Sequence, residues 1–230
     1  MIKLAVFDLD GTLCDYGKGV LAEDIALLKQ IAAAGVKIAI CSGKPVFYLC
    51  GFCRQLGLED VILIGENGGS MQFGIALPPT KFYTLSIPQE TKKRIAFFES
   101  AVKKAVPGIW CQPNEIEFSP FPQTPEEFAA IENIIAAHPE QLTGITLIRH
   151  PDCFDFIPED IHKGNALKSL AKELALSPDE MLAVGNAEND YPMFDFCGTA
   201  IGINMKDESK VNHNFPNLTT ALTYIKNELI

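Results

Sequence analysis

The sequence predicts an α/β protein with a doubly wound parallel sheet and an inserted α+β domain. Apolar runs of strand length alternate with amphipathic helical stretches near both ends of the chain, which is typical of parallel sheets. Between about 71 and 158, short alternating segments surround two helical stretches instead. We therefore expect a core formed by 1–77 and 158–230, with the inserted domain at 78–157.

The first three strand-and-helix units are recognisable from their ends. A continuous apolar run at 2–7 predicts a strand buried on both faces, and Val36–Cys41 and Val61–Ile64 predict two more. The helix between the first two strands ends at Gly35, and a second one runs from Pro45 to Gly57. The expected inward face of the first helix consists of Leu21, Ile25, Leu28 and Ile31.

The insertion and the C-terminal part carry equally specific signals. In the insertion we expect strands at 81–87 and 153–157, and a helix with Thr124 as N-cap, Pro125 next and Glu127 completing a capping box. After the insertion, a helix from Lys163 precedes strands at 181–184 and 198–203 and a last helix. The apolar stripes of these helices are Phe128, Ile131 and Ile135; Leu167, Leu170 and Leu174; and Leu218, Leu222, Ile225 and Leu229.

Charge and composition exclude several classes of protein. Nineteen Lys and Arg against 29 Asp and Glu give a formal charge of −10, the wrong sign for binding nucleic acid or an anionic membrane surface. No apolar run approaches the roughly 18 residues of a membrane span. We expect a cytoplasmic protein whose partner is a small molecule; the sequence does not predict an oligomeric state.

Seven cysteines, an odd number, argue against a disulfide framework. Cys50 and Cys53 form a CxxC, but they lie on the apolar face of a predicted helix with no second pair to complete a zinc site. We interpret them as small buried hydrophobic residues.

Four distant segments place polar residues at strand ends or helix starts: Asp8 with Asp10, Ser42, Lys163, and 186–190. Ligands of open α/β sheets bind at the carboxyl ends of the strands, so these segments can meet in one pocket. Asp8 and Asp10 suit a hard cation such as Mg²⁺, although an Asp-Gly turn capped by Asp10 explains the same spacing.

Ser42 and Gly43 offer a hydroxyl and backbone N–H groups before a helix, as a phosphate site or as an ordinary N-cap. Lys163 stands at the end of a helix that disfavours cations, which indicates an anion nearby; the alternative is a solvated lysine.

Together these residues resemble the motifs of the haloacid dehalogenase superfamily of phosphohydrolases. Residues 7–13 (Phe-Asp-Leu-Asp-Gly-Thr-Leu) resemble its first motif, and Ser42, Lys163 and 185–190 resemble the second, third and fourth in the same order. The insertion between the second and third motifs resembles the α/β cap of the Cof-type branch, and 65–69 resemble the loop leading into it. The resemblance implies a Rossmann-like core and a phosphatase acting on a sugar phosphate or a phosphoglycolate-like metabolite.

The resemblance also implies roles for single residues. Asp8 would be the nucleophile that forms an aspartyl-phosphate, and Asp10 the general acid and base. The implied phosphate-binding residues are Ser42, Gly43, Lys163 and Asn189, and the implied Mg²⁺ site consists of Asp8, Asp10, Asn186 and Asp190. Two residues depart from the family pattern: Asn186 replaces the usual Asp of the fourth motif, and Lys44 stands where many relatives have Arg.

Two alternatives stay open. One is a phosphomutase of the same family, although the shortness of the cap argues against it. The other is a catalytically weakened protein that binds a phosphorylated ligand, and Asn186 argues for it because the metal site has lost a negative charge. In each case we expect the cap to select the ligand, with Arg149, His150 and Asp155 as candidate contacts.

Overall fold

The computed structural model describes residues 1–15 and 17–230, which divide into two compact units. The first unit combines Met1–Tyr83 with His162–Ile230, and the second is Thr84–Ile161. Within the described residues, no helix is both long and apolar enough to cross a membrane.

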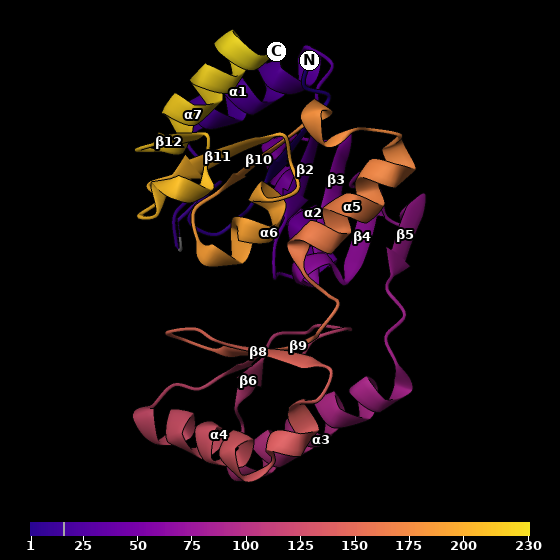
Figure 1. Ribbon diagram of the computed structural model, residues 1–230, viewed down its shortest axis with the longest axis vertical. Coiled ribbons are helices and arrows are strands. Elements are labelled where there is room, and N and C mark those ends of the chain that lie inside the picture. Colours follow the sequence, from indigo (N-terminus) through magenta and orange to yellow (C-terminus); the bar gives the residue numbers. More distant parts are fainter. Residues whose placement is uncertain (16) are drawn as a thin grey trace. The chain divides into compact units, whose positions relative to one another are not determined.

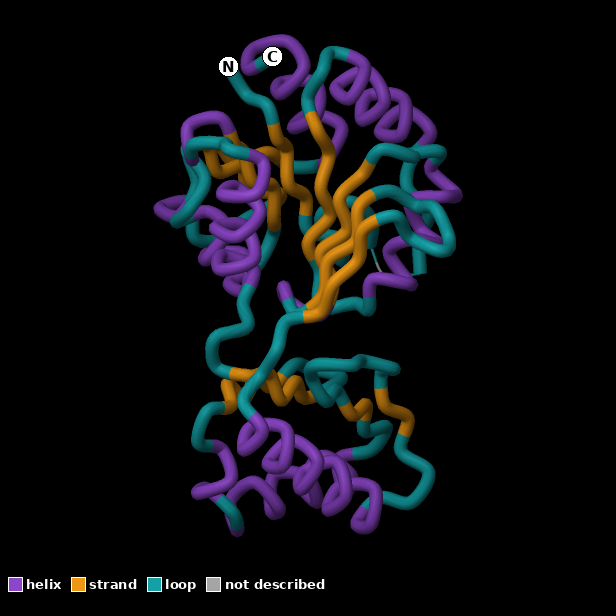
Figure 2. Tube along the Cα trace, turned by 90° about the vertical axis from the view of Figure 1, so that its right-hand side faces the viewer, coloured by secondary structure: helices purple, strands orange, loops and turns teal. Residues whose placement is uncertain are grey.

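The first unit is built on an eight-stranded sheet with helices on both faces, as Figure 2 shows. The strand order is β12-β11-β10-β1-β2-β3-β4-β5; the pairs from β12 to β3 are parallel, and β4 runs antiparallel to β3. The strands are β1 (Leu4–Phe7), β2 (Lys37–Cys41), β3 (Val61–Gly65), β4 (Ser70–Phe73), β5 (Lys81–Thr84), β10 (Met181–Gly185), β11 (Thr199–Ile203) and β12 (His213–Phe215).

The helices of the first unit make two separate cores, one on each face of this sheet. Helices α1 (Ala22–Ala33), α2 (Val46–Leu56) and α7 (Leu218–Tyr224) pack on one face, and α7 continues as a π-helical turn. Helices α5 (Lys163–Leu174) and α6 (Tyr191–Phe194) pack on the other. Because both faces are covered, the residues of β1 are all buried, and the predicted doubly wound α/β fold is confirmed.

The second unit packs two helices against short antiparallel strands (Figure 1). The helices are α3 (Gln89–Ala105) and α4 (Pro125–Ala137), and the strands are β6 (Trp110–Cys111), β7 (Pro120–Phe121), β8 (Ile145–Arg149) and β9 (Phe154–Pro158). Phe98, Phe154 and Phe156 are almost fully buried between the strands and the helices. The expected strand at 81–87 is only partly right, because β5 ends at Thr84 and is the edge strand of the first unit's sheet.

Two helix starts differ in detail from the sequence expectation. Leu21 is the N-cap of α1 and is 62% exposed, so its expected inward place is wrong. Asp24 is buried instead, since it accepts a hydrogen bond of 2.7 Å from the hydroxyl of Thr219. At α4, Thr124 accepts from the backbone N–H of Glu127 as predicted, but the Glu127 carboxylate accepts from the N–H of Gln123 rather than Thr124.

The CxxC cysteines lie in the core, as the apolar pattern of α2 predicts. Cys50 and Cys53 are both buried, and both are free thiols. Burial, with a smaller effect from Cys50, raises the pKa of Cys53 to about 12, which keeps this thiol protonated and unreactive at neutral pH.

Candidate active site

Three of the predicted segments meet because their strands are neighbours in the parallel sheet. Asp8 follows β1, Ser42 follows β2 and Asn186 follows β10, and β1 pairs with both of the other strands. The sheet extends outward in opposite directions from this point, so the crevice where ligands bind in open α/β sheets lies here.

Lys163 joins two carboxylates at this edge. Its ammonium Nζ lies 2.6 Å from Asp8 Oδ1 and 2.7 Å from Asp190 Oδ1, and its side chain is 1% exposed. The interpretation as a solvated lysine is therefore wrong. Removing Lys163 would leave the carboxylates of Asp8 and Asp190 buried without a cation, whereas removing either carboxylate would leave Lys163 paired with the other.

Burial and charge shift the pKa values of Lys163 and Asp8. Burial alone would lower the pKa of Lys163, but the carboxylates of Asp190 and Asp8 outweigh it and raise that pKa above its usual range. Burial raises the pKa of Asp8 to about 6, although the Lys163 ammonium acts in the opposite direction. Lys163 thus remains charged and favours the ionised form of Asp8.

Asp190 uses both carboxylate oxygens within the protein. Oδ1 accepts from Lys163, and Oδ2 accepts from the backbone N–H groups of Asn186 at 2.9 Å and Ala187 at 3.2 Å. Gly185 makes this approach possible, because a Cβ atom there would collide with the Asp190 carboxylate. Asp190 therefore ties Lys163 to the loop that carries Asn186.

The Asn186 amide lies where oxygen atoms of the segment after β1 converge. In one orientation its Oδ1 accepts from the Thr12 hydroxyl at 3.1 Å. In the other, its NH₂ group donates to the same hydroxyl, to the Asp10 carbonyl at 3.2 Å and to Asp8 Oδ2 at 3.3 Å. Gly11 has a φ of +81° and no Cβ to block the amide, so the Asp-Gly pair admits Asn186 to the site.

Asp10 lies further out than Asp8. The segment after Asp8 is a turn, in which Leu13 and Cys14 donate to the carbonyl of Leu9. The Asp10 carboxylate nevertheless faces Lys44, whose ammonium lies 3.5 Å from Oδ2, and each of these side chains is about one-fifth exposed. The Asp10-Gly11 pair can therefore form a turn and still leave the Asp10 carboxylate available for a function.

Ser42 is buried and does not cap the following helix. The N-cap of α2 is Pro45, and the hydroxyl of Ser42 accepts from the backbone N–H of Lys44 at 3.2 Å, so the N-cap interpretation is wrong. Backbone hydrogen bonds from Asn67 to the Ser42 carbonyl and from Glu66 to the Lys44 carbonyl hold this loop.

Glu66 and Asn67 were not predicted as site residues. Both are buried and have positive φ angles, of 52° and 53°, which non-glycine residues rarely adopt. The Asn-Gly pair in 65–69 was the available signal, since Asn tolerates this conformation. Asn189, by contrast, is exposed in the turn Glu188–Asp190, beside the buried cluster but outside its hydrogen bonds with Lys163.

The candidates in the second unit do not share one surface. Arg149 lies 2.9 Å from Glu132 and stacks over the rings of Phe128 and Phe154, on the helix side of the strands. Asp155 lies between the inward-facing Phe154 and Phe156, so it projects from the opposite face, where it pairs with His150 at 3.0 Å.

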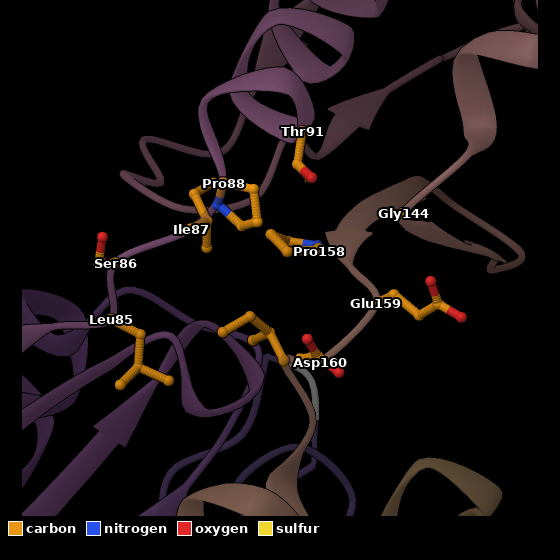
Figure 3. Close-up of a pocket in the computed structure, with 10 residues that line it drawn as sticks. Leu85, Ser86, Ile87, Pro88, Thr91, Gly144, Pro158, Glu159 and Asp160 are labelled. Carbon is orange, nitrogen blue, oxygen red and sulfur yellow. The ribbon is translucent and has the colours of Figure 1, made fainter.

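A separate pocket within the second unit is shown in Figure 3. Its lining is largely apolar and proline-rich, and the carboxylate of Glu159 points away from it in this view. It lacks the convergent charged groups found around Lys163. The lining residues are Leu85, Ser86, Ile87, Pro88, Thr91, Gly144, Pro158, Glu159, Asp160 and Ile161.

Known proteins resemble most of the chain. A phosphoglycolate phosphatase of Methanoculleus marisnigri is 29% identical, with 88% of this chain and 84% of that protein covered. An HMP-PP phosphatase of Yersinia pseudotuberculosis is 25% identical, with 87% and 83% covered. A haloacid dehalogenase-like hydrolase from Bacteroides thetaiotaomicron shares the fold, with a TM-score of 0.80, 15% identity and coverage of 98% and 100%.

The model of one family, haloacid dehalogenase-like hydrolase, matches residues 5–106 and 112–214. These ranges include every segment that meets around Lys163, and the curated relatives are named as phosphatases. The resemblance read from the four motifs is confirmed: the chain belongs to the haloacid dehalogenase-like hydrolase family.

Proposed function

We propose that this phosphatase hydrolyses a small phosphorylated metabolite through an aspartyl-phosphate on Asp8, with Mg²⁺ as its cofactor. The observation that carries the proposal is the buried ion cluster of Asp8, Lys163 and Asp190 at the carboxyl edge of the sheet. It combines a carboxylate that can attack phosphorus with a cation that can meet the phosphoryl oxygens.

The first half of the reaction forms the covalent intermediate. A carboxylate oxygen of Asp8 bonds to phosphorus while the bond from phosphorus to the leaving oxygen breaks, and protonated Asp10 gives that oxygen its proton. Lys163 supports this step by favouring the ionised form of Asp8.

The second half regenerates the enzyme. The Asp10 carboxylate takes a proton from water as the water oxygen attacks phosphorus, and the bond from phosphorus to Asp8 breaks. Inorganic phosphate leaves, Asp8 is again a carboxylate, and Asp10 is again protonated. The partly exposed place of Asp10 suits a group that must exchange protons with substrate and water.

The residues around Asn186 fit a hard divalent cation. Asp8 Oδ2, the Asp10 carbonyl and the end of the Asn186 amide converge, and turning the amide presents a third oxygen. These three groups would hold Mg²⁺, which supplies positive charge that neutralises the phosphoryl group. Asp190 would position Lys163 and the loop instead of ligating directly, since both of its oxygens accept hydrogen bonds from the protein.

Two further regions would contact the substrate, one at its phosphoryl group and one at its leaving group. Ser42, the N–H of Gly43 and Lys163 would bind phosphoryl oxygens, with Asn189 reaching in from its exposed turn. The second unit would act as a cap that selects the substrate. A sugar phosphate or a phosphoglycolate-like acid is the proposed substrate class, consistent with the phosphoglycolate phosphatases among the relatives. A cytoplasmic location remains a prediction.

The test measures phosphate release from a panel of phosphorylated sugars, acids and nucleotides, with Mg²⁺ and with a chelator. We expect metal-dependent turnover of at least one small monoester. Rapid acid quenching with labelled substrate should leave label on the peptide containing Asp8. No phosphate release from any member of the panel would favour the ligand-binding alternative, and label on another residue would contradict the mechanism.

A further inference from the structure

The second unit holds a group of metal-ligating side chains that the proposed phosphatase chemistry does not use. His150 and Cys153 lie in the turn between β8 and β9, and Asp155 is the second residue of β9; both strands are labelled in Figure 1. Each offers one ligand atom, and these atoms all lie within 4.8 Å of one another. We propose that this turn binds one divalent transition-metal ion with the chemistry of Zn²⁺.

The turn brings the three ligands together by its own backbone. The strand pairing ends at Arg149 and Phe154, and the N–H of His150 donates to the Cys153 carbonyl at 2.8 Å, which closes the loop. His150 Nε2 and Asp155 Oδ2 are already 3.0 Å apart. His150 and Cys153 are only three residues apart in sequence, so the site needs no distant segment to form.

Small side-chain movements are enough to complete the coordination. Zinc bonds to nitrogen and oxygen of about 2.0 Å, and to sulfur of about 2.3 Å, place tetrahedral ligand atoms about 3.3 to 3.8 Å from one another. Ligand atoms within 4.8 Å therefore need to approach by at most about 1.5 Å, which rotation of a side chain supplies. The backbone of the hairpin can stay as it is.

The donor types select the metal. Thiolate and imidazole favour Zn²⁺ or Co²⁺ over Mg²⁺, whose preferred ligands are oxygen atoms. On binding, the Cys153 thiol loses a proton, and a proton held at Nε2 of His150 moves to Nδ1 or to solvent. Three protein ligands leave the fourth tetrahedral place to water. Because Cys153 is 7% exposed, the metal would be shielded from solvent on that side.

The experiment uses the full chain, stripped of metal by a chelator and titrated with Co²⁺ in excess Mg²⁺. We expect one Co²⁺ per chain with a thiolate-to-cobalt charge-transfer band, and complete loss of the band when Zn²⁺ displaces it. Cobalt bound among the carboxylates of the phosphatase site would give no such band. The band therefore tests the site at Cys153 by itself, whether or not the protein proves to have the proposed phosphatase mechanism.

Matched variants assign the site. Cys153→Ser should abolish the charge-transfer band, and Asp155→Asn should weaken Zn²⁺ binding at least about tenfold. Cys111→Ser is the control, because Cys111 is a half-buried free thiol in the same unit, on β6. An unchanged band in folded Cys153→Ser, or equal loss in Cys111→Ser, would overturn the proposal. If Cys153→Ser does not fold, unchanged affinity in both Asp155→Asn and His150→Gln would overturn it as well.

Discussion

The two units place their polar residues by different means. In the first unit, parallel strands that are neighbours in the sheet deliver Asp8, Ser42 and Asn186 to one edge, although they are far apart in sequence. In the second unit, short antiparallel strands send Arg149 and Asp155 to opposite faces, although they are near each other in sequence. A fold with one ligand-binding edge therefore makes sites predictable, whereas a short hairpin requires the register to be known.

The comparison predicts that the largest effect on chemistry comes from Asp8. Asp8→Asn should lower turnover by on the order of three decades or more, because an amide cannot form the acyl-phosphate. The measurement is phosphate release by purified protein on one good substrate. Asp15→Asn is the control, since Asp15 is an exposed carboxylate seven residues away that pairs with Lys18. Wild-type turnover in Asp8→Asn would contradict the proposed nucleophile.

Lys163→Met tests how much the buried ion cluster of the first unit contributes to the stability of the protein. It leaves the carboxylates of Asp8 and Asp190 buried without their cation, so we expect a loss of about 3 to 5 kcal/mol in the free energy of unfolding. Urea denaturation followed by circular dichroism measures it. Lys168→Met, on the exposed side of the same helix, should change stability by less than about 0.5 kcal/mol. Equal stability of the two variants would show that the cluster contributes little.

Asn186→Asp tests whether the side chain at position 186 contacts the metal ion of the first unit. The added charge should lower the Mg²⁺ concentration for half-maximal activity by about tenfold, or about 1.4 kcal/mol. Calorimetric titration of Mg²⁺ gives the same comparison without turnover. Asn227→Asp is the matched control, because it adds the same charge at an exposed residue of the C-terminal π-helical turn, outside the loops that carry the site. Indistinguishable titrations for wild type and Asn186→Asp would mean that this side chain does not reach the metal.

The smallest expected effect belongs to the second unit. Thr124→Ala removes the side chain that accepts from the N–H of Glu127 at the start of α4, which should cost about 1 kcal/mol of stability. Thermal unfolding measures this change, and phosphatase turnover at low temperature should stay at the wild-type level. Thr143→Ala, where the hydroxyl bonds the carbonyl of Glu140 outside any N-cap, is a control for the loss of a surface threonine. A larger loss in the control would contradict the capping role.

Local signals predicted most of the fold but fewer of the contacts. Gly57 ends α2 in the left-handed conformation and Thr124 caps α4, because caps depend on residues close in sequence. The burial of Asp24 could not be predicted, since its partner Thr219 is 195 residues away. Lys163 was expected to meet an anion, but its two carboxylates depend on tertiary packing. The positive φ angles of Glu66 and Asn67 could not be predicted either, because the backbone N–H groups of these residues bond to the distant carbonyls of Lys44 and Ser42.

The place of β1 between β2 and β10 has a consequence for biosynthesis. Asp8 leaves the ribosome 155 residues before Lys163, and its strand pairs on one side with residues 181–184, which are made later still. The residues of the second unit are all made in the interval, and they form one compact unit, Thr84–Ile161. We therefore expect the inserted unit to fold first during synthesis. The apolar strands β1, β2 and β3 cannot complete their sheet until β10 has been made. Premature termination before β10 would leave these strands without their partner and open to aggregation.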